Sequence, residues 1–86
     1  MTPPWDSSFE LVLRPLLRSL PADTVLLPQQ DLAAVGLDSM ATVELLLQLE
    51  STYAVEIPDS LLLPSTFATP ASLWQAVQTL RTEQQA

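Results

Sequence analysis

Three reactive residue types are missing from this 86-residue chain, which has no cysteine, no histidine and no lysine. Without cysteine there is no disulfide framework, no zinc–thiolate site and no thiol nucleophile. Without histidine the chain lacks the commonest general base and metal ligand, and without lysine it lacks a Schiff-base amine. The composition therefore argues against self-contained catalysis, and we expect neither an enzyme nor a metal site.

Positive charge is also scarce, because three arginines oppose ten Asp and Glu residues and leave a net charge of −7. Nucleic acids and anionic membranes are bound through clustered Lys and Arg, so neither is an expected partner. An acidic chain should instead attract proteins that carry basic docking patches.

Long apolar runs are absent as well. The triple leucines at 45–47 and 61–63 are far shorter than the roughly 20 residues that cross a bilayer. The first residues have neither the basic nor the apolar region of a secretory signal. With 48% hydrophobic residues the chain can still form a core. We expect one domain over residues 1–86, monomeric and cytoplasmic.

Prolines and a single glycine divide the sequence into helical segments. Apolar residues recur at i, i+3 and i+4 over 7–20, which predicts an amphipathic helix with a kink or a restart at Pro15. Ser7 and Glu10 have the spacing of a capping box at its start. Residues 1–6 are expected to form a flexible leader.

Residues 21–38 are too apolar for a solvated linker, and we expect an ordered loop that buries Leu32 and Leu37. Gly36 marks a position that needs a positive φ or a close approach of the backbone. A short turn is expected within 59–67, after the breaker Pro58.

The second and last helices have the clearest boundaries. Asp38 is a favourable N-cap for 39–53, which contains neither Gly nor Pro. The last helix should begin with Thr69 as cap and Pro70 at its first position. Arg81 is expected in its last turn, ahead of a frayed tail at 82–86. The predicted fold is all-α, a small four-helix bundle with three longer helices and a short third.

The helix at 39–53 has two apolar faces, although a surface helix needs only one. One face belongs to the core and contains Thr42, Leu45, Leu46, Leu49 and Tyr53. The other contains Met40, Val43 and Leu47, with Glu44 and Glu50 beside them. Either the helix is buried nearly all round, or the second face is exposed and docks a partner through apolar contacts and its carboxylates.

Ser39 lies in the first turn of this helix, where unpaired backbone N–H groups and the helix dipole favour a phosphate. No other residue of the chain can activate it as a nucleophile, because His, Lys and Cys are absent. Ser39 is therefore either an ordinary helix-start serine or a residue that another enzyme modifies.

The run Gly-Leu-Asp-Ser-Met at 36–40 resembles the G-x-D-S-[LM] motif of acyl carrier proteins, the phosphopantetheine-attachment family. The resemblance continues in order from residue 8 to residue 80. It includes Asp-Leu at 31–32, Thr-Val-Glu-Leu at 42–45, Glu-Ile-Pro-Asp at 56–59 and Phe-Ala-Thr-Pro at 67–70.

The resemblance implies that Ser39 accepts 4′-phosphopantetheine from coenzyme A, transferred by a separate magnesium-dependent phosphopantetheinyl transferase. Asp38 looks like the aspartate that helps this transferase and its metal to engage. The positions that it implies for partner docking are Met40, Val43, Glu44 and Leu47, and the second apolar face adds Glu50 to them. The chain would carry an acyl thioester to synthases, ligases or transferases of polyketide, lipid or lipopeptide biosynthesis.

The same residues leave two alternatives to an acyl carrier. The chain could be an aminoacyl or aryl carrier of a nonribosomal peptide pathway, or a helical adaptor in which Ser39 is never modified. The sequence Val-Gly-Leu-Asp-Ser and the charge of −7 favour the acyl cargo. The leucines at 61–63 replace the acidic third-helix region of fatty-acid-synthesis carriers. They either line an acyl cavity or, as we expect, belong to the core.

Overall fold

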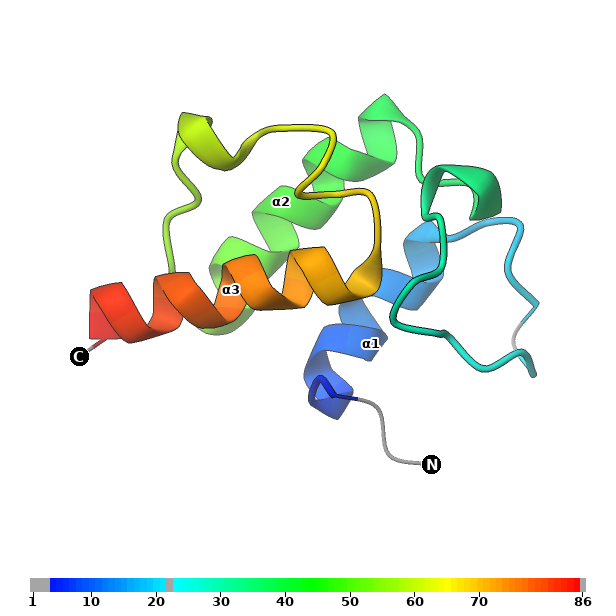
Figure 1. Ribbon diagram of the computed structural model, residues 1–86, viewed down its shortest axis with the longest axis horizontal. Coiled ribbons are helices and arrows are strands. Elements are labelled where there is room, and N and C mark those ends of the chain that lie inside the picture. The colour runs from blue at the N-terminus through cyan, green and yellow to red at the C-terminus, as the bar shows by residue number, and fades with distance from the viewer. Residues whose placement is uncertain (1–3, 22, 86) are drawn as a thin grey trace.

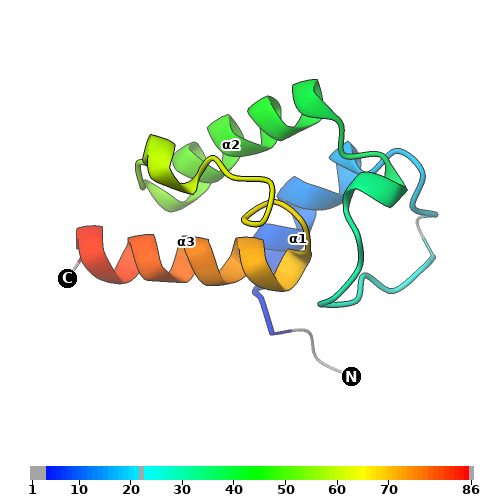
Figure 2. The ribbon, with the colours of Figure 1, turned by 45° about the horizontal axis from the view of Figure 1, so that its top comes forward.

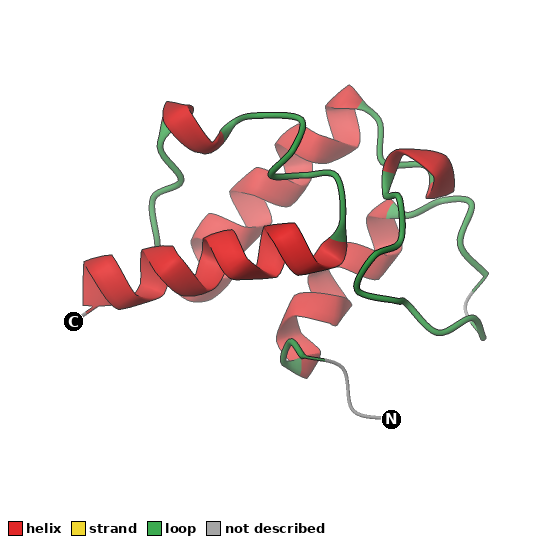
Figure 3. Ribbon diagram, viewed as in Figure 1, coloured by secondary structure: helices red, strands yellow, loops and turns green. Residues whose placement is uncertain are grey.

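The computed structural model describes residues 4–21 and 23–85, and within these ranges it contains helices and loops but no strand (Figures 1 and 3). The α-helices are α1 (Ser7–Leu13), α2 (Ser39–Tyr53) and α3 (Pro70–Gln85). The single-turn 3-10 helices are η1 (Arg14–Leu16), η2 (Ala33–Val35) and η3 (Asp59–Leu61). The all-α prediction is confirmed, and the expected short third helix is the single turn η3.

The core lies where α1, α2 and α3 meet (Figure 2). Aromatic rings join the three helices, because Trp74 of α3 lies 5.1 Å from Phe9 of α1 and 6.1 Å from Tyr53 of α2, between ring centroids. Leucine and valine side chains fill the space around them. The fully buried ones include Leu13, Leu32, Leu45, Leu49, Leu73 and Val77.

The first helix is shorter than the predicted 7–20. α1 ends at Leu13, and the chain tightens into η1, which contains Pro15. Proline has no N–H to continue the α-helical ladder and crowds the carbonyl four residues earlier. After η1, Leu17 leaves the helical region with φ −96° and ψ 77°. Pro15 therefore ends the α-helix, and only the single 3-10 turn η1 follows, where a kink or a restart of the helix was expected.

The start of α1 also differs from the prediction. Asp6 is the N-cap, since its Oδ1 accepts a hydrogen bond from the backbone N–H of Phe9 at 2.9 Å. Glu10 does not complete a capping box with Ser7. Its carboxylate accepts hydrogen bonds from the Trp5 indole at 2.9 Å and from Arg14 at 2.6 Å. These two donors, Trp5 first, lower the pKa of Glu10.

The leader expected at 1–6 is wrong for Trp5 and Asp6; residues 1–3 lie outside the described residues. Trp5 is only 4% exposed, and its ring lies 5.8 Å from that of Phe9. The Tyr53 hydroxyl donates to Asp6 Oδ1 at 2.6 Å, and burial followed by this hydrogen bond raises the pKa of Tyr53. The bundle therefore includes the chain from Trp5 onward.

Residues 23–38, which lead to α2, pack against the core as predicted and fix the approach to that helix. Among these residues, Leu26, Leu32 and Leu37 are buried. The backbone N–H of Leu32 donates to the carbonyl of Ala68 at 2.9 Å, which ties the loop to the entry of α3. The Asp31 carboxylate accepts from the N–H of Ala33, the first residue of η2, at 3.1 Å.

α3 begins as predicted but extends further. The Thr69 hydroxyl accepts from the N–H of Ser72 at 3.2 Å, and Pro70 is the first helical residue. The frayed tail is wrong for 82–85, because the helix continues to Gln85; Ala86 lies outside the described residues. The Gln84 amide bonds both the N–H and the carbonyl of Glu56, at 2.8 and 2.7 Å.

Because α3 is longer than expected, Arg81 does not lie in its last turn. Its guanidinium lies over the Tyr53 ring, 5.0 Å from the centroid, and also donates to Gln78 at 3.1 Å. Arg81 therefore joins α3 to α2 by a cation–π contact rather than complementing the end of the helix dipole. Over the part of the chain that is described, no helix is long and apolar enough to span a membrane.

Candidate functional site

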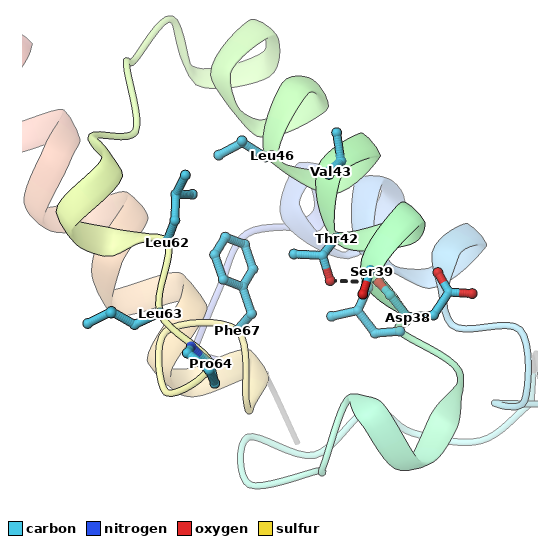
Figure 4. A pocket seen from close by; sticks show the side chains of 10 residues that line it. Asp38, Ser39, Thr42, Val43, Leu46, Leu62, Leu63, Pro64 and Phe67 are labelled. Carbon is cyan, nitrogen blue, oxygen red and sulfur yellow. Dashed lines mark hydrogen bonds between the residues drawn. The ribbon is translucent and has the colours of Figure 1, made fainter.

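Ser39 is the first residue of α2, and its side chain is exposed (Figure 4). Its hydroxyl makes no hydrogen bond to any described residue. A hydroxyl with no structural partner at a helix start is available to an enzyme that approaches from solvent. The structure therefore places the predicted attachment residue where modification requires no unfolding.

Asp38 holds the start of α2, as predicted. Its Oδ1 accepts from the N–H of Ala41 at 2.8 Å, with φ −90° and ψ −175° at the cap residue. Its carbonyl accepts from both the N–H and the hydroxyl of Thr42, at 2.9 and 2.8 Å. The N–H groups of Ser39 and Met40 bond to no described atom. These two donors fit a phosphate attached to Ser39.

Gly36 allows the loop to pass close to the end of η1. Its φ is +107°, which confirms the predicted positive φ. A Cβ at this position would lie 2.9 Å from the backbone nitrogen of Arg18 and 3.2 Å from that of Ser19. The N–H of Ser19 donates to the Val35 carbonyl at 2.9 Å, so the two segments are joined there. Only glycine satisfies both the φ and the spacing.

An open cleft of about 580 Å³ begins at Ser39 and runs between α2 and residues 62–67. Its apolar lining comes from both sides and includes Val43, Leu46, Leu62, Leu63 and Phe67 (Figure 4). Leu62 and Leu63 are exposed, so our expectation that the triple leucine belongs to the core is wrong for these two. η3 ends at Leu61, and Leu62 leaves the helical region with ψ 57°, which directs the next residues toward the cleft.

The second face of α2 is exposed. Met40 is 82% exposed, Leu47 59% and Val43 56%, and Glu44 is exposed beside them. The alternative of a helix buried all round is therefore wrong. The core face of α2 instead contains Ala41, Leu45, Leu49 and Tyr53, with Thr42 and Leu46 half-buried. Ala41 is the buried residue that the apolar spacing missed, because alanine is a weak signal of burial.

Glu50 has a different environment from Glu44. Its side chain is half-buried, and its Oε2 accepts from the backbone N–H of Ile57 at 2.8 Å. This hydrogen bond fixes the loop that follows α2. Among the sequence-predicted docking residues, the structure brings together Met40, Val43, Glu44 and Leu47, while the Glu50 carboxylate turns to the loop.

The predicted attachment residue therefore lies exposed at the start of a helix of this bundle, in a chain without His, Lys or Cys. The chain matches the family model described as the phosphopantetheine attachment site over residues 13–77. It therefore belongs to this family of carrier proteins. Such a carrier is not an enzyme, and its prosthetic group is a covalently attached 4′-phosphopantetheine.

Known proteins that are similar to this chain include the following two. An aminoacyl carrier protein of Agrobacterium fabrum (strain C58 / ATCC 33970) is 38% identical over 58 residues, which are 67% of this chain and 69% of that protein. The second is a chain in the crystal structure of Bradyrhizobium japonicum glycine:[carrier protein] ligase complexed with glycylated carrier protein. That match has a TM-score of 0.65 and 27% identity, and covers 83% of this chain and 99% of the other.

Proposed function

We propose that this protein is a carrier in which Ser39 bears the phosphopantetheine arm and the arm is loaded with an amino acid. The observation that supports Ser39 as the attachment site is its exposed hydroxyl, which makes no hydrogen bond to the described residues. The cargo is supported by the two relatives, one an aminoacyl carrier protein and the other a chain from a complex with a glycylated carrier. This is the alternative that the sequence left open, and we prefer it to the acyl cargo.

The work of the chain is to present the arm. The phosphopantetheine group supplies a thiol that holds the cargo as a thioester, the sulfur that this cysteine-free chain lacks. Asp38 fixes the helix start through Ala41, and the N–H groups of Ser39 and Met40 face the attached phosphate. The transferase supplies the base, because this chain has no His, Lys or Cys and hence no side-chain base stronger than a carboxylate. The tethered cargo reaches partner active sites at high effective concentration.

The exposed face of α2 is proposed as the docking surface for the transferase and for a loading ligase. It combines three apolar side chains, Met40, Val43 and Leu47, with the carboxylate of Glu44. A complementary partner surface is apolar at its centre and carries Arg or Lys at its rim. The net charge of −7 favours the encounter with such a basic patch.

Charge reversal at Glu44 is expected to weaken docking without harming the fold. In Glu44→Arg, the attraction of a basic rim becomes repulsion, and we expect the KM of the loading ligase to rise roughly tenfold. Glu44 is exposed, so the free energy of unfolding should change by no more than about 0.5 kcal/mol. Steady-state loading kinetics and thermal unfolding measure the two effects.

Glu83→Arg is the matched control, since Glu83 is also exposed but lies on α3. It makes the same change of net charge away from the docking face, and we expect its KM to stay within twofold of the parent. Equal effects of the two variants would show that net charge alone governs docking, and would contradict the proposed face.

The cargo is tested by loading the modified protein. After conversion with coenzyme A and a broad-specificity phosphopantetheinyl transferase, the protein is offered ATP and glycine with a glycine:[carrier protein] ligase. In parallel it is offered ATP and octanoate with an acyl-activating ligase. Intact mass spectrometry should show the glycyl adduct to form much faster than the octanoyl adduct.

An acyl cargo is the second candidate, and the cleft beside Ser39 favours it. Leu46, Leu62 and Phe67 give that cleft an apolar lining to which an alkyl chain could bind. Faster formation of the octanoyl adduct would establish the acyl carrier and overturn the aminoacyl proposal. A protein that gains no phosphopantetheine at all would instead be the unmodified adaptor.

A further inference from the structure

Arg18 is the one arginine of the three that has no partner among the described residues. Arg14 pairs with Glu10 at 2.6 Å and donates to the carbonyl of Thr24, also at 2.6 Å. Arg81 lies over the Tyr53 ring. The Arg18 side chain is exposed and makes no hydrogen bond, ion pair or ring contact with a described residue. In a chain without lysine or histidine, it is the cation left available for a ligand.

The position of Arg18 is fixed against the loop that leads to Ser39. A Cβ on Gly36 would lie 3.4 Å from the Cβ of Arg18, and Ser19 donates its N–H to Val35 at 2.9 Å. The end of the first helical segment lies beside η2 in both Figure 1 and Figure 2. From Gly36 to Ser39 is three residues, a span of at most roughly 10 Å. Arg18 and the residue proposed to bear the arm therefore lie on neighbouring segments.

We propose that Arg18 pairs with the phosphodiester that joins the arm to Ser39, and so acts as a positioning residue for the arm. The inference rests on the proposed attachment at Ser39. A guanidinium suits this role because its planar fork of N–H donors matches two phosphate oxygens. With the N–H groups of Ser39 and Met40, it would surround the phosphate with donors from two elements of the bundle.

The neighbouring carboxylate of Asp38 gives the pairing of Arg18 with the phosphate a specific role. The carboxylate of Asp38 precedes the phosphate along the chain and repels it. Its Oδ1 is engaged by Ala41, so it cannot turn away without losing the helix cap. Arg18 would offset this repulsion and bias the arm toward the η1 side of Ser39, away from random directions in solvent. The contact is exposed, so it should weaken as salt rises.

The test uses the whole chain. Coenzyme A and a phosphopantetheinyl transferase convert it to the form that bears phosphopantetheine, and intact mass spectrometry confirms the conversion. On conversion, the Nε–H resonance of Arg18 should shift, and its hydrogen exchange should slow by roughly 1.5- to 5-fold, the range of an exposed ion pair. Arg14 and Arg81 serve as internal references, because both already have partners. Their Nε–H signals should change little.

The phosphorus resonance of the attached arm gives a second measurement. It should move in Arg18→Gln, return only part of the way in Arg18→Lys, which keeps the charge but not the fork, and stay unchanged in Glu83→Gln, which alters an exposed charge on α3. An Arg18 signal that shifts no more than that of Arg81 would overturn the proposal. A raised KM for the ligase in Arg18→Gln, with unchanged phosphorus and Nε–H signals, would also overturn it and assign Arg18 to partner docking. Failure to gain the phosphopantetheine mass would instead reject the proposed function.

Discussion

Replacing Ser39 by alanine is expected to abolish the mass gain that follows incubation with coenzyme A and a phosphopantetheinyl transferase. The loss should be complete, because the phosphate is esterified to this one hydroxyl. Ser7 has a similar setting, first in α1 after the N-cap Asp6, but it lacks the Gly-Leu-Asp-Ser-Met sequence that surrounds Ser39. The fold should be retained. The hydroxyl makes no hydrogen bond to the described residues, and the Asp38 cap bonds Ala41 and Thr42, not Ser39.

Intact mass and circular dichroism together make this test decisive. Alanine is a good helix former, so the free energy of unfolding should change by no more than about 0.5 kcal/mol. Ser51→Ala is the matched control, since Ser51 is an exposed serine of the same helix. It should take up one phosphopantetheine like the parent. A mass gain in Ser39→Ala, or its loss in Ser51→Ala, would reject Ser39 as the attachment residue.

The elements that sequence predicted best are those with local causes. The N-cap at Asp38 and the start of α3 at Pro70 depend on hydrogen bonds and φ values within a few residues. The positive φ of Gly36 follows in the same way from glycine being the residue that adopts it without strain. These features also build the start of α2, which is why the candidate site could be located before the structure.

The features that sequence missed depend on contacts between distant residues. Trp5 lies in the core because Phe9 offers it a ring, and Asp6 is held by Tyr53, 47 positions away. Arg81 was expected to interact with the end of the helix dipole, but its guanidinium instead lies 5.0 Å from the centroid of the Tyr53 ring. Periodicity along one helix cannot supply such information, because it does not say which helix faces which.

The cleft is the part of the site that the pattern of residues left ambiguous. Three successive leucines before Pro64 could all be buried in the core, or they could line a cleft, and the sequence alone does not distinguish the two. The structure separates them, because Leu61 packs against the core while Leu62 and Leu63 line the cleft beside Ser39. The deciding factor is where η3 ends, and single-turn helices have few sequence signals of their own.

Gly36→Ala is expected to have the largest effect on stability, because two costs coincide at this position. An alanine at φ +107° is strained, and its Cβ would lie 2.9 Å from the Arg18 backbone nitrogen, which cannot move aside as a flexible side chain would. We expect the free energy of unfolding to fall by about 2–4 kcal/mol, a large part of what a domain of this size has. Urea denaturation followed by circular dichroism measures the loss.

Ala54→Gly is the matched control, because Ala54 is an alanine that already has a positive φ, 54°, at the end of α2. Glycine there relieves the strain, so the free energy of unfolding should rise by about 0.5–1 kcal/mol. The two exchanges of glycine and alanine should therefore move stability in opposite directions. Because Gly36 also supports the approach to Ser39, the Gly36→Ala protein should gain phosphopantetheine more slowly even where it remains folded. An unfolding midpoint that Gly36→Ala leaves unchanged would contradict the close approach of the Ser39 loop to Arg18, on which the geometry of the attachment site depends.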